Sequence, residues 1–87
     1  MDEPIDNRSE MEKWLAGGYW KEVSSSNVAK IRYRNWDRVL EVEFKSGWAY
    51  DYFEVPYEVA RAMYMAESKG KFIHNRMRGA FRYNRVK

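Results

Sequence analysis

The residues with the clearest chemical potential are the basic side chains near the end of the chain. Residues 68–87 hold seven Lys and Arg and no acid, a net charge of +7, whereas residues 1–67 carry a net −4. Phosphate contacts from Lys and Arg supply most of the affinity of sequence-independent nucleic-acid binding. The side chains that we expect to contact phosphate are Lys69, Lys71, Arg76, Arg78 and Arg82, extended by Lys30, Arg32 and Arg34. The competing interpretation is a solvated helix face followed by a charged tail.

Aromatic side chains near these cations are candidates for stacking on unpaired bases, as in single-strand binders. Trp36 lies in a predicted turn between two arginines, and Tyr83 lies in the basic tail. Tyr50 and Tyr52 alternate along one predicted strand. A sheet that is covered by helices needs one apolar face, so the favoured interpretation places Tyr50 and Tyr52 mainly in the core, with their hydroxyl groups at its rim.

The sequence offers little for catalysis. His74 is the single histidine, and its neighbours Arg76 and Arg78 disfavour its charged form, but a general base also needs a partner that the sequence does not identify. Ser24-Ser25-Ser26 lacks the glycine context of a nucleophile elbow. The acidic residues without metal-ligand spacing are Glu41, Glu43, Asp51, Glu54 and Glu58. We therefore predict a non-enzymatic protein with no cofactor and no metal site.

Length and composition bound the remaining possibilities. Eighty-seven residues with 45% hydrophobic content predict one folded domain, and four Trp, seven Tyr and four Phe compensate for its small size. The absence of cysteine excludes disulfides and thiolate metal sites. The acidic amino terminus is unlike a signal peptide, and no apolar run is long enough to cross a bilayer. We expect a soluble, cytoplasmic protein without membrane contact.

These candidate residues need a scaffold, which the periodicity of the first half of the chain predicts. Ser9 followed by Glu12 forms a capping box for a short helix that docks through Trp14 and ends at Gly17-Gly18, after a frayed arm over residues 1–8. Apolar and polar residues alternate over residues 28–34, 39–44 and 48–55. Short connections join these segments, so they predict an antiparallel meander, in which Arg32 or Arg34 faces Glu41 or Glu43.

The second half predicts two helices. Pro56 suits the first helical position, and apolar residues recur at helical intervals until Ser68-Lys69-Gly70. A shorter helix follows, from Phe72 to about Gly79. The tail, residues 82–87, fits either a short edge strand or a frayed end.

The order of these residues resembles the KTSC domain family, a small domain named for its place at the carboxyl end of some lysyl-tRNA synthetases. The resemblance runs from Val23 to about Tyr83, and its core is Tyr50-Asp51-Tyr52 followed by Val55-Pro56. The other residues that carry it are Val23-Ser24-Ser25-Ser26, Ile31, Tyr33, the segment 40–44, Gly47, the segment 66–72 and Met77-Arg78. Because KTSC domains are attached to some tRNA synthetases, the resemblance leads us to expect that this protein binds RNA.

Together these observations predict an α+β fold: a three-stranded antiparallel β-meander packed by helices, with one short N-terminal helix and two C-terminal helices. Residues 1–22 form an acidic N-terminal arm with the short helix, and residues 23–87 form the KTSC-like domain. The predicted function is a nucleic-acid binding module, with RNA preferred over DNA. The alternative is an accessory factor that docks on a larger protein through Trp14, Tyr19 and Trp20, because Trp and Tyr are enriched in interface hot spots.

Overall fold

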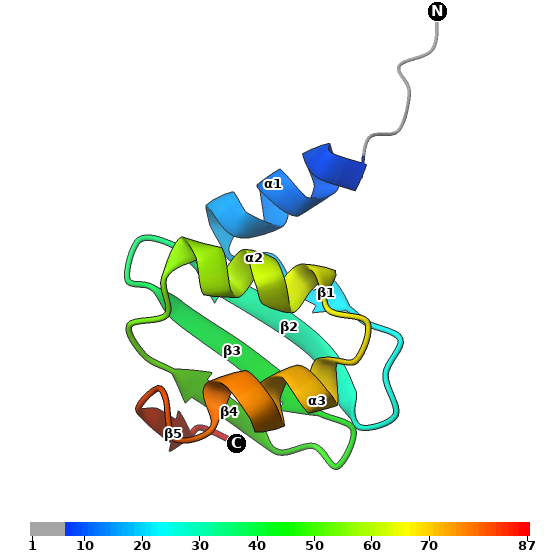
Figure 1. The fold of residues 1–87 in the computed structure, drawn as a ribbon, viewed down its shortest axis with the longest axis vertical. Helices are drawn as coiled ribbons and strands as arrows, with labels where there is room; N and C mark the ends of the chain where they lie inside the picture. Colours follow the sequence, from blue (N-terminus) through cyan, green and yellow to red (C-terminus); the bar gives the residue numbers. More distant parts are fainter. Residues whose placement is uncertain (1–6) are drawn as a thin grey trace, which may run out of the picture.

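One five-stranded antiparallel sheet organises the chain, and each strand pairs with its neighbours in sequence (Figure 1). The computed structural model describes the backbone of residues 7–87 and the side chains of residues 10–87. The elements are α1 (Asn7–Gly17), β1 (Lys21–Glu22), β2 (Val28–Arg34), β3 (Val39–Phe44), β4 (Ala49–Tyr52), α2 (Tyr57–Met65), α3 (Lys69–Phe72), the π-helical turn η1 (Ile73–Met77) and β5 (Tyr83–Arg85). The predicted α+β class is confirmed, whereas the predicted number of three strands is wrong.

The missing strands are the two short edges of the sheet. Strand β1 has two residues and β5 has three, too few to show a period of their own, and each forms by pairing with a longer strand. Of the two structures predicted for the tail, a short edge strand and a frayed end, the edge strand is observed as β5. The central meander β2-β3-β4 is confirmed. Of the Arg–Glu pairings that the sequence left open, the register sets Arg32 opposite Glu41. Strand β4 ends before the predicted Val55, because the backbone of Glu54 turns into the left-handed region with φ of 55°.

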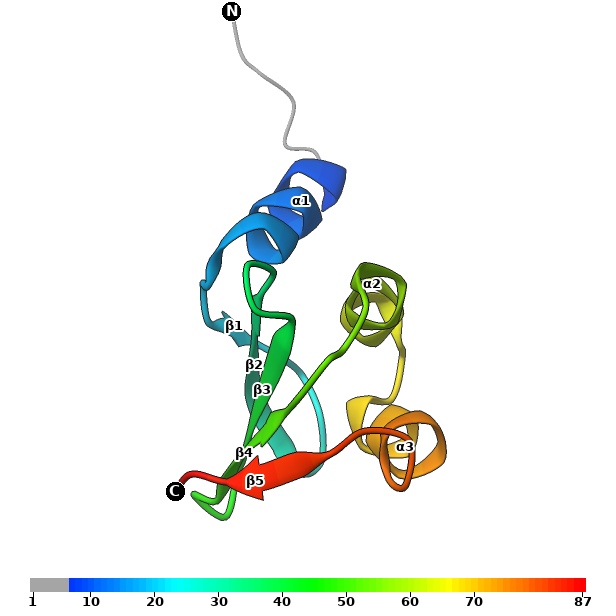
Figure 2. The same ribbon diagram turned by 90° about the vertical axis from the view of Figure 1, so that its left-hand side faces the viewer.

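The helices form a layer on one face of the sheet, as Figure 2 shows for α2 and α3. Helix α2 follows Pro56, but Pro56 is its extended N-cap residue and not, as predicted, its first helical residue. The helix ends at Met65, because Ala66 is already extended. Ser68 begins the next helix instead of ending the previous one, since its hydroxyl accepts a hydrogen bond from the Lys71 backbone N–H at 3.2 Å. The second predicted helix is divided into α3 and η1.

Helix α1 packs against β2 and α2 at one end of the sheet (Figure 1). Its docking through Trp14 is confirmed, since Met11, Trp14 and Leu15 belong to the same buried cluster as the sheet. The boundary predicted between residues 22 and 23 therefore does not separate two packing units. Ser9 is not the N-cap, because α1 already includes Asn7, and docking of the helix supports this additional turn. Residues 1–6 of the predicted arm lie outside the described residues.

The core lies between the sheet and the helices. Its buried residues are Met11, Trp14, Leu15, Val28, Ile31, Tyr33, Leu40, Val42, Tyr52, Val55, Ala60, Met63, Phe72, Ile73 and Met77. Within it, the hydroxyl of Tyr33 donates a hydrogen bond of 2.7 Å to the backbone carbonyl of Val55. This bond ties the central strand β2 to the segment that leads into α2.

Candidate nucleic-acid interface

A groove of about 880 Å³ lies between the helix-covered face of the sheet and the segment α3–η1. Its lining residues are Ser26, Asn27, Phe44, Lys45, Ser46, Trp48, Tyr50, Tyr52, Gly70, Ile73, His74, Arg78, Gly79 and Tyr83. We call it the aromatic groove. Five of its residues are aromatic, and none is acidic. A volume of this order suits a ligand of a few hundred cubic ångströms, such as one or two nucleotides.

The aromatic wall of the groove is a continuous series of rings on β3, β4 and β5. The ring centroid of Tyr50 lies 5.9 Å from that of Phe44, in an edge-to-face arrangement, and 5.7 Å from that of Tyr83. The centroids of Tyr83 and Tyr52 are 5.8 Å apart. The pairing of β4 with β5 brings these rings together, because it sets Tyr52 opposite Tyr83. Only the tertiary structure unites them, since β5 follows β4 at a distance of about thirty residues along the chain.

Exposure differs sharply along this wall. The side chain of Tyr52 is buried, Tyr50 is half-buried, and Tyr83 is 58% exposed. Tyr50 and Tyr52 therefore pack with the core as the favoured interpretation holds, and both also line the groove. Burial raises the pKa of Tyr52, and the neighbouring Tyr50 and Tyr83 raise it further, against the opposing effect of Arg78. The phenol of Tyr52 stays neutral at physiological pH and can donate a hydrogen bond into the groove.

The opposite wall carries the polar groups. The guanidinium of Arg78 lies 3.3 Å from Nδ1 of His74, so the two side chains share one side of the groove. The π-helical turn η1 places them there, and its last bond runs from the Arg78 N–H to the Ile73 carbonyl at 2.9 Å. Single π-helical turns are frequent at functional sites, because the wider turn redirects side chains. Lys45, from the β3–β4 turn, adds a second cation to the lining.

The predicted phosphate-binding residues of the basic segment have different surroundings. Lys69 is a structural residue: its ammonium donates to the backbone carbonyls of Tyr64 at 2.8 Å and Ala66 at 2.6 Å, at the end of α2. Burial lowers its pKa, as does nearby Lys21. Lys71 and Arg76 are exposed, on and beside α3. Arg82 forms an exposed ion pair of 3.4 Å with Glu54, so a phosphate must compete with that carboxylate.

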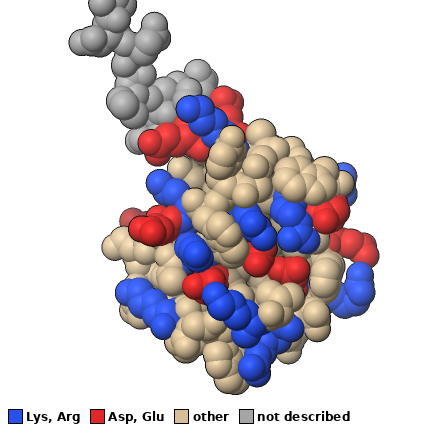
Figure 3. Space-filling view, turned by 180° about the vertical axis from the view of Figure 1, so that it is seen from behind, with Lys and Arg blue, Asp and Glu red and all other residues tan. Residues whose placement is uncertain are grey.

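The three cations of β2 lie on the opposite face of the sheet. Lys30, Arg32 and Arg34 alternate with the core residues Ile31 and Tyr33, so they point away from the helices. They consequently do not extend the surface formed by Arg76 and Arg78. On the open face, basic and acidic side chains are interspersed, as Figure 3 shows.

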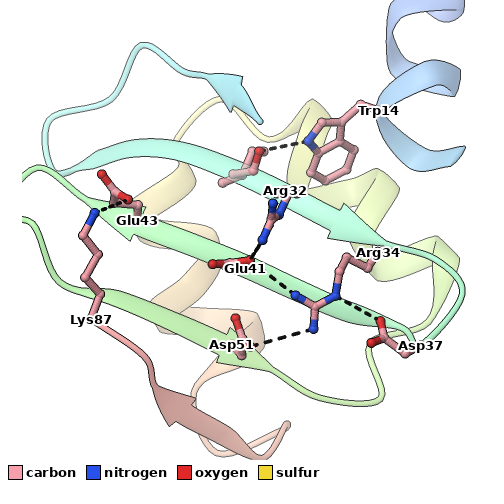
Figure 4. Close-up of polar contacts among 9 residues, drawn as sticks. Trp14, Arg32, Arg34, Asp37, Glu41, Glu43, Asp51 and Lys87 are labelled. Atoms are coloured by element: carbon pink, nitrogen blue, oxygen red, sulfur yellow. Dashed lines mark hydrogen bonds and ion pairs between the residues drawn. The ribbon is translucent and has the colours of Figure 1, made fainter. Parts of the chain in front are cut away.

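An ion-pair network neutralises this open face (Figure 4). Arg32 and Arg34 both contact Oε1 of Glu41, Arg32 through Nε at 3.1 Å and Arg34 at 3.5 Å. Arg34 also lies 3.3 Å from Asp37 and 3.9 Å from Asp51. Positive charge that is already paired in this way adds little to phosphate binding, because the carboxylates would repel the ligand.

Asp51, between the two tyrosines of β4, belongs to this network. Its Oδ1 atom is buried and has no hydrogen-bond partner among the side chains and backbone groups that the structure describes. Burial raises the pKa of Asp51, and the nearby Glu41 raises it further, whereas Arg34 and Arg32 lower it. The alternation of β4 thus separates two environments: the tyrosines face the groove, and the carboxyl between them faces the ion pairs.

The remaining aromatic candidates lie outside the groove. Trp36 is 65% exposed, and its ring covers Gly18, at the end of β2 and β3 farther from the groove. The prediction that Trp14 contributes to an exposed docking surface is wrong, because its side chain is 2% exposed, stacks with Tyr33 and packs against the tilted ring of Tyr64. Tyr19 is exposed, and the ring of Trp20 is covered by Lys30 and Arg32. Of the three aromatic residues predicted to dock on a partner, Tyr19 is exposed and Trp20 is partly exposed.

Some groove residues escaped the sequence reasoning. Asn27 and Lys45 lie in two different loops, which a hydrogen bond of 2.8 Å from the Lys45 N–H to the Asn27 carbonyl holds together. No local pattern marks these two positions, because their proximity arises from strand pairing. Trp48 also lines the groove, and the period of two in the sequence does indicate that it shares a strand face with Tyr50 and Tyr52. The guanidinium of Arg85 lies 3.9 Å from the ring centroid of Trp48. Within residues 10–87, no group of His, Asp and Glu side chains is arranged to hold a metal ion. In the same part of the chain, no helix has the length and apolar character to span a membrane.

A model of the KTSC domain family matches residues 24–81, which include both walls of the groove except Tyr83. This chain belongs to the KTSC domain family. It is similar to a crystal structure of a KTSC domain protein from Yersinia pestis, with a TM-score of 0.75 and 30% sequence identity over 82% of this chain and 100% of that one. The resemblance that the sequence suggested is thus confirmed.

This KTSC domain is also similar to a segment of a larger protein and to most of a small one. A lysine–tRNA ligase of Trichormus variabilis is 36% identical over 61 residues, which are 70% of this chain and 11% of the ligase. The chain therefore spans only a small part of that relative. A protein of Tsukamurella paurometabola is 35% identical over 60 residues, 69% of this chain and 90% of that protein. Helix α1 precedes the residues that match the family model.

Proposed function

We propose that this KTSC domain is a non-enzymatic module that binds single-stranded nucleic acid, RNA in preference to DNA, in the aromatic groove. The observation that carries the proposal is the composition of the groove: five aromatic side chains, the cations Lys45 and Arg78, and no carboxylate. Bases stack on aromatic rings irrespective of sequence, and cations beside the rings hold the phosphates. A duplex hides the faces of its bases, so the groove suits unpaired nucleotides.

The distribution of positive charge around the aromatic groove also supports nucleic-acid binding. Arg78 lies at the groove, and the exposed Lys71 and Arg76 lie near it along α3 and η1. Within residues 10–87, none of these three side chains forms an ion pair, unlike Arg32 and Arg34 on the open face. A strand that leaves the groove along this helix would meet further unneutralised cations. The kinship with segments of lysine–tRNA ligases favours RNA over DNA.

A salt titration of binding to a labelled single-stranded RNA tests the proposal. The logarithm of the association constant should fall steeply with the logarithm of salt concentration, and each lost phosphate contact should reduce the slope by about 0.7. Lys45→Ala with Arg78→Ala should therefore reduce both affinity and slope. Arg61→Ala is the matched control, because Arg61 is exposed on α2 and does not line the groove.

Tyr83→Ala tests the stacking component separately. Tyr83 is largely exposed, so its replacement leaves the fold intact, whereas the loss of one base–aromatic stack costs about 1–3 kcal/mol of binding free energy. The salt slope should stay unchanged in this variant. Millimolar or weaker binding by the wild type, or an unchanged affinity in both the charge and the tyrosine variants, would exclude nucleic acid as the ligand of the groove.

A further inference from the structure

Trp48 and Arg85 form a stacked pair at one end of the aromatic groove. Trp48 lines the groove and is 48% exposed, and the Cζ atom of Arg85 lies 3.9 Å from the centroid of its ring. A guanidinium and a nucleic-acid base are both flat groups that stack on the face of an aromatic ring. This face of Trp48 is therefore a stacking position that a side chain of the protein itself fills.

The register of β4 and β5 sets Arg85 between the two exposed rings of the groove. Arg85 lies opposite Tyr50, and Tyr83 lies opposite Tyr52, so both β5 residues share the sheet face that carries the aromatic wall. Side chains on one face of a strand repeat every two residues, and Trp48 precedes Tyr50 by two. Tyr83, Arg85 and Trp48 consequently follow one another along the edge of the sheet.

The positive charge of Arg85 is available to a ligand. Its Nε donates to the backbone carbonyl of Lys87 at 3.3 Å. In the part of the chain whose side chains are described, no carboxylate forms an ion pair with Arg85. Lys87 differs in this respect, because its ammonium lies 3.5 Å from the carboxylate of Glu43 (Figure 4). A phosphate near Arg85 thus meets a cation that no acidic side chain neutralises.

We infer that Trp48 and Arg85 form a second nucleotide-binding subsite of the aromatic groove, beside the stacking position on Tyr83. The inference rests on the proposed function. When a strand binds, a base replaces the guanidinium on the ring of Trp48, and the guanidinium turns to the adjoining phosphate. This exchange moves only an exposed side chain, and the guanidinium gains a charge-assisted, bidentate contact in return. A strand that spans both subsites binds more tightly than a single nucleotide, because its second contact is intramolecular.

Trp48→Ala and Arg85→Gln test the two parts of this subsite. Trp36→Ala is the matched control for the first, because Trp36 is also exposed but lies at the end of β2 and β3 farther from the groove. Lys87→Gln is the matched control for the second, since it removes the same charge from the same tail, but from a side chain that already contacts Glu43. All four substituted residues are exposed, so the variants should keep the fold.

The measurements are anisotropy of a labelled eight-nucleotide oligo(U) over a range of salt concentrations and tryptophan emission with the unlabelled oligonucleotide. Binding should quench the emission of the wild type and of Trp36→Ala. It should not quench that of Trp48→Ala, whose affinity should fall about 5- to 100-fold, the range for one lost base–aromatic stack. Arg85→Gln should reduce the salt slope by about 0.7, and Lys87→Gln should leave it unchanged.

Two results would overturn the inference while the proposed function stands. One is equal quenching in Trp48→Ala and Trp36→Ala, and the other is an equal salt slope in Arg85→Gln and Lys87→Gln. Failure of the wild type to bind oligo(U) in the anisotropy measurement would refute the proposed function itself.

Discussion

Trp14 is the most informative position for stability, because it joins a helix outside the family match to the core of the domain. Its side chain is 2% exposed, and its Nε1 donates a 3.0 Å hydrogen bond to the Ile31 carbonyl. Its ring stacks on Tyr33 and packs against the tilted ring of Tyr64. Trp14→Ala removes a ring and leaves a cavity, at a cost of about 3–5 kcal/mol. Trp14→Phe keeps an aromatic ring but loses the hydrogen bond, at a cost of about 1–2 kcal/mol.

These costs are large against the stability expected of such a small domain. At about 0.05–0.15 kcal/mol per residue, an 87-residue chain has roughly 4–13 kcal/mol in total. Trp14→Ala therefore removes about a quarter of that stability or more. Deletion of residues 1–18 should prevent folding, although it keeps the whole segment that matches the family.

Urea unfolding followed by circular dichroism at 222 nm gives these free energies without relying on tryptophan fluorescence. Trp36→Ala is the control, because Trp36 is 65% exposed and its loss should cost less than about 1 kcal/mol. A loss below about 1 kcal/mol for Trp14→Ala, with an unchanged denaturant slope, would refute the reasoning. So would a chain without residues 1–18 that unfolds at the wild-type midpoint.

Two further predictions concern single charged groups. Asp51 has a raised pKa in the folded state, so the folded protein holds its proton more tightly, and stability falls as pH rises above the ordinary value of 3.8. Asp51→Asn should raise the melting temperature at pH 7 and lose that advantage near pH 3; an equal difference at both pH values would contradict this. Lys69→Met should lower stability by about 1–2 kcal/mol, because two carbonyls at the end of α2 lose a charged donor. Lys71→Met should instead leave stability unchanged and weaken RNA binding; the reverse pattern in urea and salt titrations would show that the two roles are exchanged.

Part of the fold was predictable because its signals are local. The alternation over β2 and β3 sets the faces of the sheet, and Pro56 marks the start of α2. A cross-strand contact between an arginine of β2 and a glutamate of β3 also followed from the alternation, but the register of the hairpin decided that Arg32 faces Glu41. A local sequence pattern that is compatible with two secondary structures was less reliable. Ser68-Lys69-Gly70 fits both the end of one helix and the start of another, and the Ser68 hydroxyl shows that it is the start, because it caps α3.

The basic residues show the limit of reasoning from composition. A net +7 segment is visible in the sequence, but the availability of each cation depends on neighbours that are distant along the chain. Lys69 is held by the carbonyls of α2, Arg82 pairs with Glu54, and Arg34 is covered by carboxylates. Charge is additive along a sequence, whereas pairing depends on distances in space.

The α+β class, the central antiparallel meander, the docking of a short N-terminal helix and the membership of the KTSC family all followed from the amino-acid sequence. Which residues share a site depends instead on how the elements pack in three dimensions. Pairing of β4 with β5 brings Tyr83 beside Tyr52, the loops of Asn27 and Lys45 meet through one backbone hydrogen bond, and η1 supplies Arg78 from the other side. The physical reason is that periodicity reports which face of an element is buried, but a groove is formed by side chains from several elements whose spacing depends on long-range packing.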